Sequence, residues 1–233
     1  MTVQAIDCLG VVLAGGLSSR MGQDKAKLQR QFSSASPKNW PSTTSAQSMS
    51  RLSMLDFSKQ LLSDAGIKNI VVSGDNHQIP DCVAQAGPVG GIYSVLAHYL
   101  ANSPEHLQPK AFLILPVDLP LMTAQALAEL KLKGQLSNKA TFFSDSQNHH
   151  HHIPLYLPNN AFLQLFLKQA FQQENVLTGS KSKAINSNNN KKNGPSVRAM
   201  LKNVPHQAVA SLNNKLLFNT NTPEQWQQAQ QKF

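Results

Sequence analysis

A glycine pair near the N-terminus, followed by two cations, has the residue types that bind phosphate. Gly15 and Gly16 come directly after a short apolar stretch, and the cations Arg20 and Lys25 follow them. Glycines let the backbone approach a ligand closely and point its N–H groups at oxygen atoms. Two cations at this spacing can close over a polyphosphate, so the pattern predicts a polyphosphate-binding loop.

This loop differs from both common phosphate-binding motifs. It lacks the third glycine of the dinucleotide-binding loop and also the Gly-Lys-Ser/Thr triplet. A tight turn carrying two surface cations is the alternative, and we would prefer it for a glycine pair alone. The full string of residues 13–25 favours phosphate binding instead.

Asp118 is the residue best suited to a metal ion. It follows a predicted buried strand at 112–115 and the intervening Pro116. A carboxylate at the end of such a strand suits Mg²⁺ that is shared with phosphate oxygens. An aspartate in a turn between two prolines is the alternative explanation. In company with the glycine loop, Asp118 is predicted to hold Mg²⁺.

The elements that position these residues alternate along the chain. We expect buried strands at 9–14, 70–72, 112–115, 141–143, 155–157 and 216–218, and helices at 52–62, 92–99, 123–132, 161–171 and from 222. The segment 87–91 reads as a turn. Alternation of this kind implies an α/β fold with a Rossmann-like, mostly parallel sheet and helices on both faces. Ligands of such sheets bind beyond the carboxyl ends of the strands, where the loop and Asp118 fall.

Residues 13–25, Leu-Ala-Gly-Gly-Leu-Ser-Ser-Arg-Met-Gly-Gln-Asp-Lys, resemble the signature of the MobA-like nucleotidyltransferases, in particular the molybdenum cofactor guanylyltransferases among them. Three later segments extend the resemblance in the same order. These are Gly-Pro-Val-Gly-Gly-Ile at 87–92, Pro-Val-Asp-Leu-Pro at 116–120 and Asn-Thr-Asn-Thr-Pro-Glu at 219–224. The first and last segments are the most specific, and together the matches span nearly the whole chain.

The resemblance implies one domain over residues 1–233 with the nucleotide-diphospho-sugar transferase-like fold. Its nucleotide-binding half would cover about 1–120 and its acceptor-binding half about 121–233. Contacts with the nucleotide and its metal are then expected at Leu13, Ala14, Gly15, Gly16, Lys25, Ser73, Asp81 and Asp118. Ser73 takes a position that the family often gives to asparagine. A plain loop acid is the alternative for Asp81.

The C-terminal asparagines of the resemblance, Asn219 and Asn221, would lie near the acceptor side of the cleft. Structural roles in a turn and in a helix cap would explain these two asparagines equally well. The catalytic residues implied are Lys25, Arg20 and Asp118, of which the first two are cations that neutralise phosphate charge.

The activity implied is transfer of GMP from GTP to the molybdopterin-bound molybdenum cofactor, with release of pyrophosphate and with Mg²⁺ as cofactor. An acceptor phosphate would attack the α-phosphorus, while the protein supplies position and charge. Proteins of cofactor biosynthesis, or molybdoenzymes, are the partners this would imply. A related enzyme that uses CTP or another phosphorylated acceptor stays open. So does a non-catalytic nucleotide-binding module, although the presence of Lys25 and Asp118 weighs against it.

Two segments, at about 29–53 and 179–195, are rich in Ser, Asn and Lys and are expected to be flexible insertions. The second would shape access for the acceptor. They carry seven of the nine net positive charges of the chain, among them Arg30, which we expect to be a solvated loop charge. Because the charge sits in these segments, and because no aromatics alternate with cations on strands, binding to nucleic acid is not expected.

Four consecutive histidines, His149 to His152, precede Ile153 and Pro154. Members of the family have a histidine immediately before this proline, whereas here Ile153 takes that position. We expect solvated loop residues that face the acceptor, and we assign them no metal.

The remaining composition bounds the location of the protein. Cys8 and Cys82 are too few for a disulfide framework, which favours free thiols in a reducing compartment. No stretch approaches the roughly 20 apolar residues needed to span a bilayer, and no basic segment precedes the first apolar run. We expect a cytoplasmic protein that does not associate with a membrane.

Overall fold

The structure is a computed structural model that describes residues 5–15, 21–31, 51–172, 193–211 and 213–233. Gly16 and Arg20 lie outside these ranges. Residues 32–50 of the first predicted insertion and 179–192 of the second lie outside them as well, so the flexibility expected there stays a prediction.

One six-stranded sheet organises the described part of the chain, in the order β4-β1-β5-β7-β6-β8. The strands are β1 Leu9–Leu13, β4 Asn69–Ser73, β5 Ala111–Pro116, β6 Ala140–Ser144, β7 His150–Pro158 and β8 His206–Ala210. Strands β4, β1 and β5 run parallel, as do β6 and β8. Strand β7 runs antiparallel to both of its neighbours. The sheet is therefore mostly parallel, as predicted.

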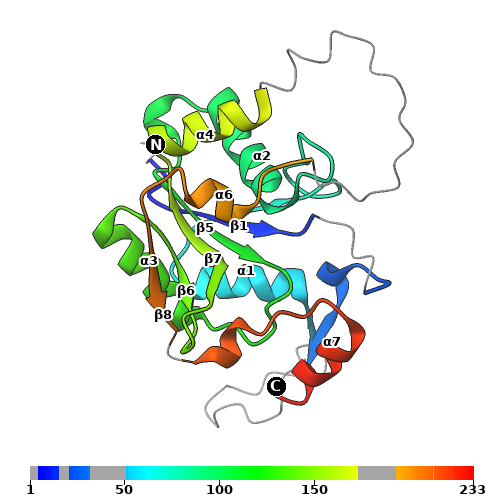
Figure 1. Ribbon diagram of the computed structural model, residues 1–233. Coiled ribbons are helices and arrows are strands. Elements are labelled where there is room, and N and C mark those ends of the chain that lie inside the picture. The colour runs from blue at the N-terminus through cyan, green and yellow to red at the C-terminus, as the bar shows by residue number, and fades with distance from the viewer. Residues whose placement is uncertain (1–4, 16–20, 32–50, 173–192, 212) are drawn as a thin grey trace, which may run out of the picture.

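Helices cover both faces of this sheet (Figure 1). One face carries α1 Met54–Asp64, α3 Ala124–Ser137 and α7 Pro223–Gln230, and the other carries α2 Gly87–Asn102, α4 Ala161–Gln172 and α6 Val197–Leu201. Side chains alternate along each strand, so Val12 joins the core under α1 while Val11 and Leu13 join the core under α2. This confirms the Rossmann-like α/β arrangement.

The helix ends follow the signals in the sequence. Thr123 caps α3 by accepting a hydrogen bond from the N–H of Ala126, and Asn160 accepts one from the N–H of Leu163 at the start of α4. Thr222 and Gln225 form the reciprocal capping box at the start of α7. These local polar contacts are readable from sequence because both partners lie within one helical turn.

Three predicted elements were wrong. Residues 87–91 are the first turns of α2 rather than a free turn. Residues 214–217 form a 3-10 helix rather than a strand, and the last strand is β8, which sequence reasoning missed. Strand β8 lies at the sheet edge and alternates exposed and half-buried residues, so it lacks a buried apolar run. Helix α3 continues past Gly134, because a glycine there lets the helix lie directly against the Tyr156 ring.

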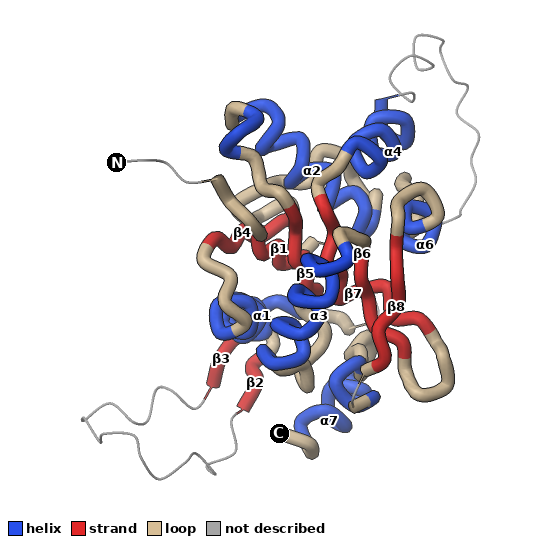
Figure 2. The backbone as a smooth tube through the Cα atoms, turned by 90° about the vertical axis from the view of Figure 1, so that its left-hand side faces the viewer, coloured by secondary structure: helices blue, strands red, loops and turns tan. Residues whose placement is uncertain are grey.

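The ends of the first insertion are ordered, contrary to the expectation of a flexible loop over all of 29–53. Strands β2 Gln29–Gln31 and β3 Arg51–Ser53 pair antiparallel in a ribbon of their own. Figure 2 shows this ribbon beside α1 and separate from the main sheet.

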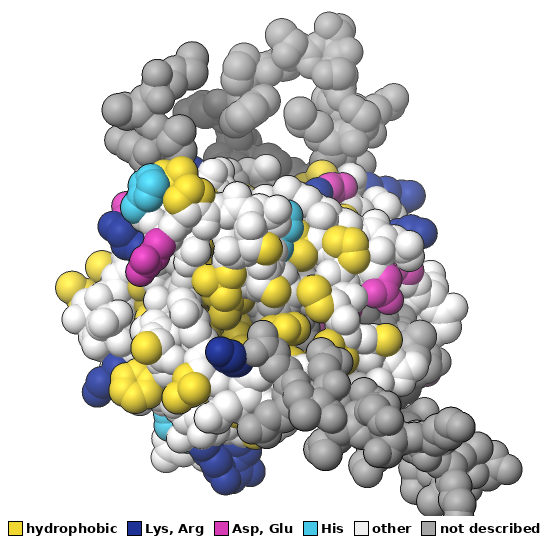
Figure 3. All heavy atoms as spheres, turned by 90° about the horizontal axis from the view of Figure 1, so that it is seen from above, with side chains coloured by type: hydrophobic (Ala, Val, Ile, Leu, Met, Phe, Trp, Pro, Cys, Tyr) yellow, Lys and Arg dark blue, Asp and Glu magenta, His cyan; other side chains and the backbone are white. Residues whose placement is uncertain are grey.

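A shallow apolar groove lies between the C-terminal half of α2 and α4, with a volume of about 410 Å³. Tyr93, Leu96, Leu100 and Leu167 line it, with Lys168 beside them. Figure 3, which views the molecule from the α4 side, shows hydrophobic side chains gathered on this face. The groove lies apart from the strand ends that carry the predicted site.

Within the ranges that the structure describes, no helix combines the length and the apolar character needed to cross a bilayer. Cys8 and Cys82 are both free thiols.

Candidate active site

The carboxyl ends of three parallel strands meet side by side. Leu13, the last residue of β1, is level with Ser73 on β4 and with Pro116 on β5. The chain leaves these ends as the glycine loop, as the segment towards Asp81 and as the turn that contains Asp118. The residues that the sequence singled out and that the structure describes are thereby brought to one edge of the sheet.

The glycine loop packs its backbone against the neighbouring strand end. The N–H of Ala14 donates a hydrogen bond to the carbonyl of Ser73 at 3.0 Å. A side chain on Gly15 would place its Cβ only 2.8 Å from Asp81 Oδ2 and 3.2 Å from Gly74 Cα. Gly74 has φ +148, which favours glycine, and its own Cβ would lie 2.8 Å from the nitrogen of Gly15. Both glycines are required for this close approach.

Sequence reasoning found Gly15 and missed Gly74. The available signal was a glycine directly after a buried strand, which marks a close backbone contact. Gly16 and Arg20 cannot be placed, because they lie in the undescribed part of the loop. Their predicted contacts with the nucleotide stay predictions.

Ser73 joins Asp81 to the start of α2. The buried Ser73 hydroxyl oxygen lies 3.3 Å from Asp81 Oδ1 and 3.3 Å from the carbonyl oxygen of Gly91. A Cβ on Gly91 would come within 2.9 Å of Leu13 and 3.2 Å of the Ser73 hydroxyl, so glycine allows α2 to approach here. The structure thus brings Gly15, Ser73 and Asp81 together, with the Asp81 carboxylate beside the glycine loop.

Burial raises the pKa of Asp81 above its ordinary value of 3.8, and the negative charge of Asp75 adds to this rise. The hydrogen bond from Ser73 and the nearby His77 act in the opposite direction and lower it. A half-buried carboxylate that is costly to keep ionised is a common feature of ligand sites.

This raised pKa predicts a pH-dependent stability difference for Asp81→Asn. Between pH 3.8 and the raised value, the folded state binds more protons than the unfolded state, so stability falls as pH rises through this window. This loss of stability persists at neutral pH, and asparagine avoids it because its side chain does not ionise. We expect the variant to have a higher Tm than the wild type at pH 7, with the gap closing as the pH falls towards 3.8.

Thermal unfolding measured across this pH range tests the expectation. Asp64→Asn is the matched control, since Asp64 is an exposed carboxylate at the end of α1. A Tm difference for Asp81→Asn that stays constant with pH would contradict it.

Lys25, Asp118 and Asn221 form a second group at the same edge. The Lys25 ammonium lies 3.1 Å from Asp118 Oδ2 and 2.6 Å from Asn221 Oδ1. The Lys25 and Asp118 side chains are each only 16% exposed, so this ion pair is largely shielded from water. Asp24, whose side chain caps the 3-10 helix Lys25–Lys27, fixes the backbone from which Lys25 projects.

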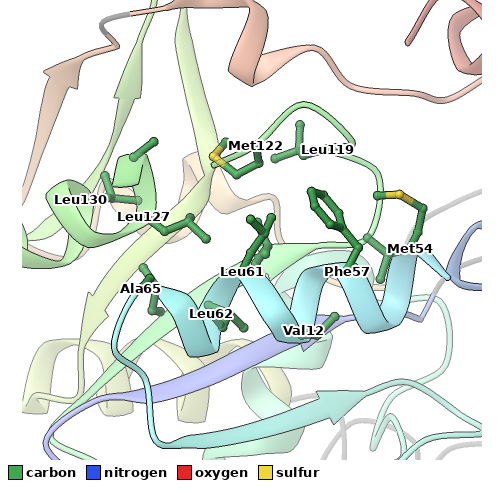
Figure 4. Close-up of a cluster of buried hydrophobic side chains, with 14 of the residues drawn as sticks. Val12, Met54, Phe57, Leu61, Leu62, Ala65, Leu119, Met122, Leu127 and Leu130 are labelled. Carbon is green, nitrogen blue, oxygen red and sulfur yellow. The ribbon is translucent and has the colours of Figure 1, made fainter. Parts of the chain in front are cut away.

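The turn that carries Asp118 is held from two sides. Both the N–H and the hydroxyl of the buried Thr220 donate to the Asp118 carbonyl, at 2.9 and 3.2 Å. After Asp118, Leu119 and Met122 enter the core beside Phe57 of α1 (Figure 4). The carboxylate is therefore set on a rigid turn.

The second carboxylate oxygen of Asp118 fits a cation. Asp118 Oδ1 is buried, and no hydrogen-bond donor reaches it from the part of the chain that the structure describes. A buried polar atom without a partner is costly, and a hard cation is the natural ligand of a carboxylate oxygen. No group of three or more His, Cys, Asp or Glu side chains among the described residues could hold a metal by itself. Asp118 would therefore share a cation with ligand oxygens.

Arg30 corrects an expectation from the sequence, because it is not a solvated loop charge. Its Nε donates to the carbonyl of Pro120 at 2.9 Å, and its guanidinium carbon lies 4.4 Å from the centre of the Phe57 ring and 4.6 Å from that of Phe233. Burial lowers the pKa of Arg30 from its ordinary value. Arg30, stacked between the two rings, thus holds the backbone of the turn that contains Asp118. Phe57 and Phe233 are distant from Arg30 in sequence, so the sequence did not indicate this contact.

Three of the four histidines, His150 to His152, are part of the sheet rather than a loop, since β7 begins at His150, whereas His149 lies in the preceding loop as expected. His150 and His152 pack around the buried Phe142 ring, and the exposed His149 pairs with Asp145 at 3.1 Å. Burial, followed by the neighbouring His150 and Arg198, lowers the pKa of His152. The apolar period of β7 starts only after these residues, which is why the sequence placed the strand too late.

Asn221 belongs to the Lys25 group rather than only to a turn or cap. Thr222 does the capping work at this end of α7. Asn219 is exposed. The contact between Asn221 and Lys25 joins opposite ends of the chain, and no local pattern in the sequence indicates it.

Comparisons with known proteins agree with this geometry. A family model described as the MobA-like NTP transferase domain matches residues 10–182. A curated relative from Xanthomonas euvesicatoria pv. vesicatoria, named molybdenum cofactor guanylyltransferase, is 30% identical over 222 residues, which is 93% of this chain and 91% of the relative.

Two solved structures show the same fold. The molybdopterin-guanine dinucleotide biosynthesis protein A of Archaeoglobus fulgidus has a TM-score of 0.61 at 13% identity, covering 96% of this chain and 97% of that one. The 2-C-methyl-D-erythritol 4-phosphate cytidylyltransferase of Thermus thermophilus has a TM-score of 0.51 at 14% identity, covering 100% and 98%.

Proposed function

The chain belongs to the MobA-like NTP transferase family, and from this premise we propose that it transfers GMP from GTP to the molybdopterin-bound molybdenum cofactor, releasing pyrophosphate. The acceptor and the base follow from the likeness to the guanylyltransferase of Xanthomonas. The cytoplasmic location and the partner proteins implied by the sequence belong to the same proposal.

The observation that carries the proposal is the arrangement around Asp118. A lysine ammonium and a carboxylate with an unpartnered oxygen stand together at the end of β5, level with the glycine loop. A cation and a carboxylate-held Mg²⁺ are what a triphosphate requires for charge neutralisation. Mg²⁺ would be held by Asp118 and would shield the negative charge on the phosphates.

In the reaction, a phosphate oxygen of the acceptor forms a new bond to the α-phosphorus of the nucleotide. The bond from the α-phosphorus to the bridging oxygen breaks, and pyrophosphate leaves with that electron pair. Lys25 offers a point charge to the phosphates, and the glycine loop offers backbone N–H groups. The protein orients the reactants and stabilises charge, and it forms no covalent bond to either one.

Asp81 supports guanine as the base. An ionised carboxylate only accepts hydrogen bonds, and guanine presents two adjacent donors, its ring N1–H and its amino group, whereas adenine and cytosine present only an amino group on that edge. The Asp81 carboxylate lies beside Gly15, two residues beyond the end of β1, and the Ser73 hydroxyl fixes its orientation. Such an acceptor at the base pocket would favour guanine over a base that offers fewer donors.

A thermal-shift panel tests the base assignment. We expect GTP with Mg²⁺ to raise the Tm more than ATP, CTP or UTP, because a ligand that binds only the native state stabilises it. With free ligand at about a hundred times its Kd, the gain is about 2.7 kcal/mol, which is several degrees for a domain of this size.

Each outcome of the panel is informative. A clear preference for CTP would contradict the guanylyl assignment and favour a cytidylyltransferase of the same fold. Equal shifts for all four nucleotides would also contradict the guanylyl assignment, and no shift at all would contradict nucleotide binding.

A further inference from the structure

Asn221 contacts the Lys25 ammonium directly, and the proposed transfer reaction does not by itself assign it a role. Its Oδ1 accepts the shorter of the two hydrogen bonds from Lys25, 2.6 Å against 3.1 Å to Asp118. Asn221 lies just before α7, 196 residues along the chain from Lys25. The C-terminal segment thus reaches back to the principal cation of the site.

The Asn221 backbone is itself held firmly. Its N–H donates to Gln225 Oε1 at 2.7 Å, the same oxygen that accepts from the Thr222 N–H in the capping box that starts α7. The preceding Thr220 is buried and donates twice to the Asp118 carbonyl. Trp226 then anchors α7 in the core under the sheet. Asn221 is a fixed acceptor on a rigid support.

Lys25 needs such a support. A lysine side chain has many rotamers, and fixing one conformation costs conformational entropy. In the structure Asp118 shares this work through charge. A cation held by Asp118 would repel the ammonium and weaken that attraction, since both carry positive charge. The neutral amide oxygen of Asn221 carries no charge for the cation to cancel.

We propose that Asn221 is a positioning residue for Lys25, keeping the ammonium aimed at the nucleotide phosphates after Asp118 has engaged a cation. The inference rests on the proposed nucleotide binding and deepens it. Asn221 acts on the phosphates only through Lys25, so its contribution disappears when Lys25 is absent.

A double-mutant cycle tests this dependence in the full-length protein. The variants are Asn221→Leu, which keeps the size but removes the acceptor, Lys25→Met, and the two combined. Calorimetric titration uses the nucleotide that stabilises the wild type most in the four-nucleotide panel, both with a chelator and with Mg²⁺. Asn221→Ala repeats the test with a smaller side chain if Asn221→Leu folds poorly. Gln228→Ala, on the exposed side of α7, is the control for the segment.

We expect Asn221→Leu to weaken triphosphate binding about tenfold with Mg²⁺, as for loss of a hydrogen bond to a charged group, and less with a chelator, where Asp118 still holds the ammonium. In the Lys25→Met background, Asn221→Leu should reduce triphosphate affinity by less than about twofold, because the effects of substitutions at two coupled residues are not additive. Binding of the corresponding nucleoside should not change, since only phosphates contact Lys25. If Asn221 had a merely structural role, the substitution would weaken the binding of both the triphosphate and the nucleoside.

Three results would overturn the inference. The first is an equal loss on Asn221→Leu in both backgrounds. The second is a loss that appears only with Mg²⁺ and persists without Lys25, which would make Asn221 a ligand of the metal. The third is triphosphate affinity that does not change in either Asn221 variant. If the wild type binds none of the four nucleotides, the proposed function fails first, and the two failures are thereby distinguished.

Discussion

Asp118→Asn is expected to reduce turnover by at least about a hundredfold, the largest effect of any single change in this site. In the wild type, the Asp118 carboxylate pairs with Lys25 through Oδ2, and its Oδ1 is free to bind a cation. Asparagine keeps the shape of the side chain but removes this negative charge. Removing one element of transition-state charge stabilisation typically costs on the order of 10²–10³ in rate. Steady-state kinetics with GTP, Mg²⁺ and the molybdopterin acceptor measures this loss.

The same variant should bind nucleotide without regard to Mg²⁺, retaining part of the affinity that the wild type shows in a chelator. Calorimetric titration with and without Mg²⁺ separates this from a general loss of binding. Asp64→Asn, at an exposed carboxylate on α1, is the control and should behave as the wild type. Normal turnover in Asp118→Asn would place the metal elsewhere and contradict the mechanism.

Lys25→Met is expected to weaken triphosphate binding at least tenfold, both with Mg²⁺ and with a chelator. Methionine keeps a linear side chain of similar length and removes the ammonium, which is worth about 1.5–3 kcal/mol in a charge-assisted hydrogen bond. The Lys25 side chain is 16% exposed, so solvent screens its charge only weakly. Calorimetric titration of GTP into the variant measures the change.

Lys27→Met provides a matched control in the same 3-10 helix. The Lys27 side chain is 85% exposed and lies 3.8 Å from Asp24, so its charge is strongly screened. It should bind GTP within about twofold of the wild type. If both lysine variants lose affinity equally, the effect reflects net charge rather than a specific phosphate contact.

Much of the fold was predictable from the sequence because its signals are local. The buried runs of β1, β4 and β5 have no polar interruptions, and the caps at Thr123 and Thr222 place both partners within one turn. Strand β8 was missed because it lies at the sheet edge, and the first residues of β7 were missed because they are polar and at least partly exposed. The spacing of apolar residues in the sequence does not reveal a strand that is only partly buried.

The site was predictable to the extent that its residues end strands. Gly15, Ser73 and Asp118 each follow a buried run, and the parallel register brings them level. The contact of Asn221 with Lys25 and the stacking of Arg30 between Phe57 and Phe233 required the tertiary structure. Such contacts depend on packing between distant segments, for which a single sequence contains no period or spacing.

The reversed direction of β7 has a consequence for how the activity could be altered. The five other strands all point towards the same edge, so β7 alone brings the beginning of a strand there, and the segment 145–149 enters at the site. That segment and the chain leaving β8 belong to the half opposite the glycine loop. On the proposed function, in which Asp81 contacts the base, we expect loop grafting at these two places to change acceptor preference and to leave Asp81 untouched, which makes the sheet a modular platform for engineering.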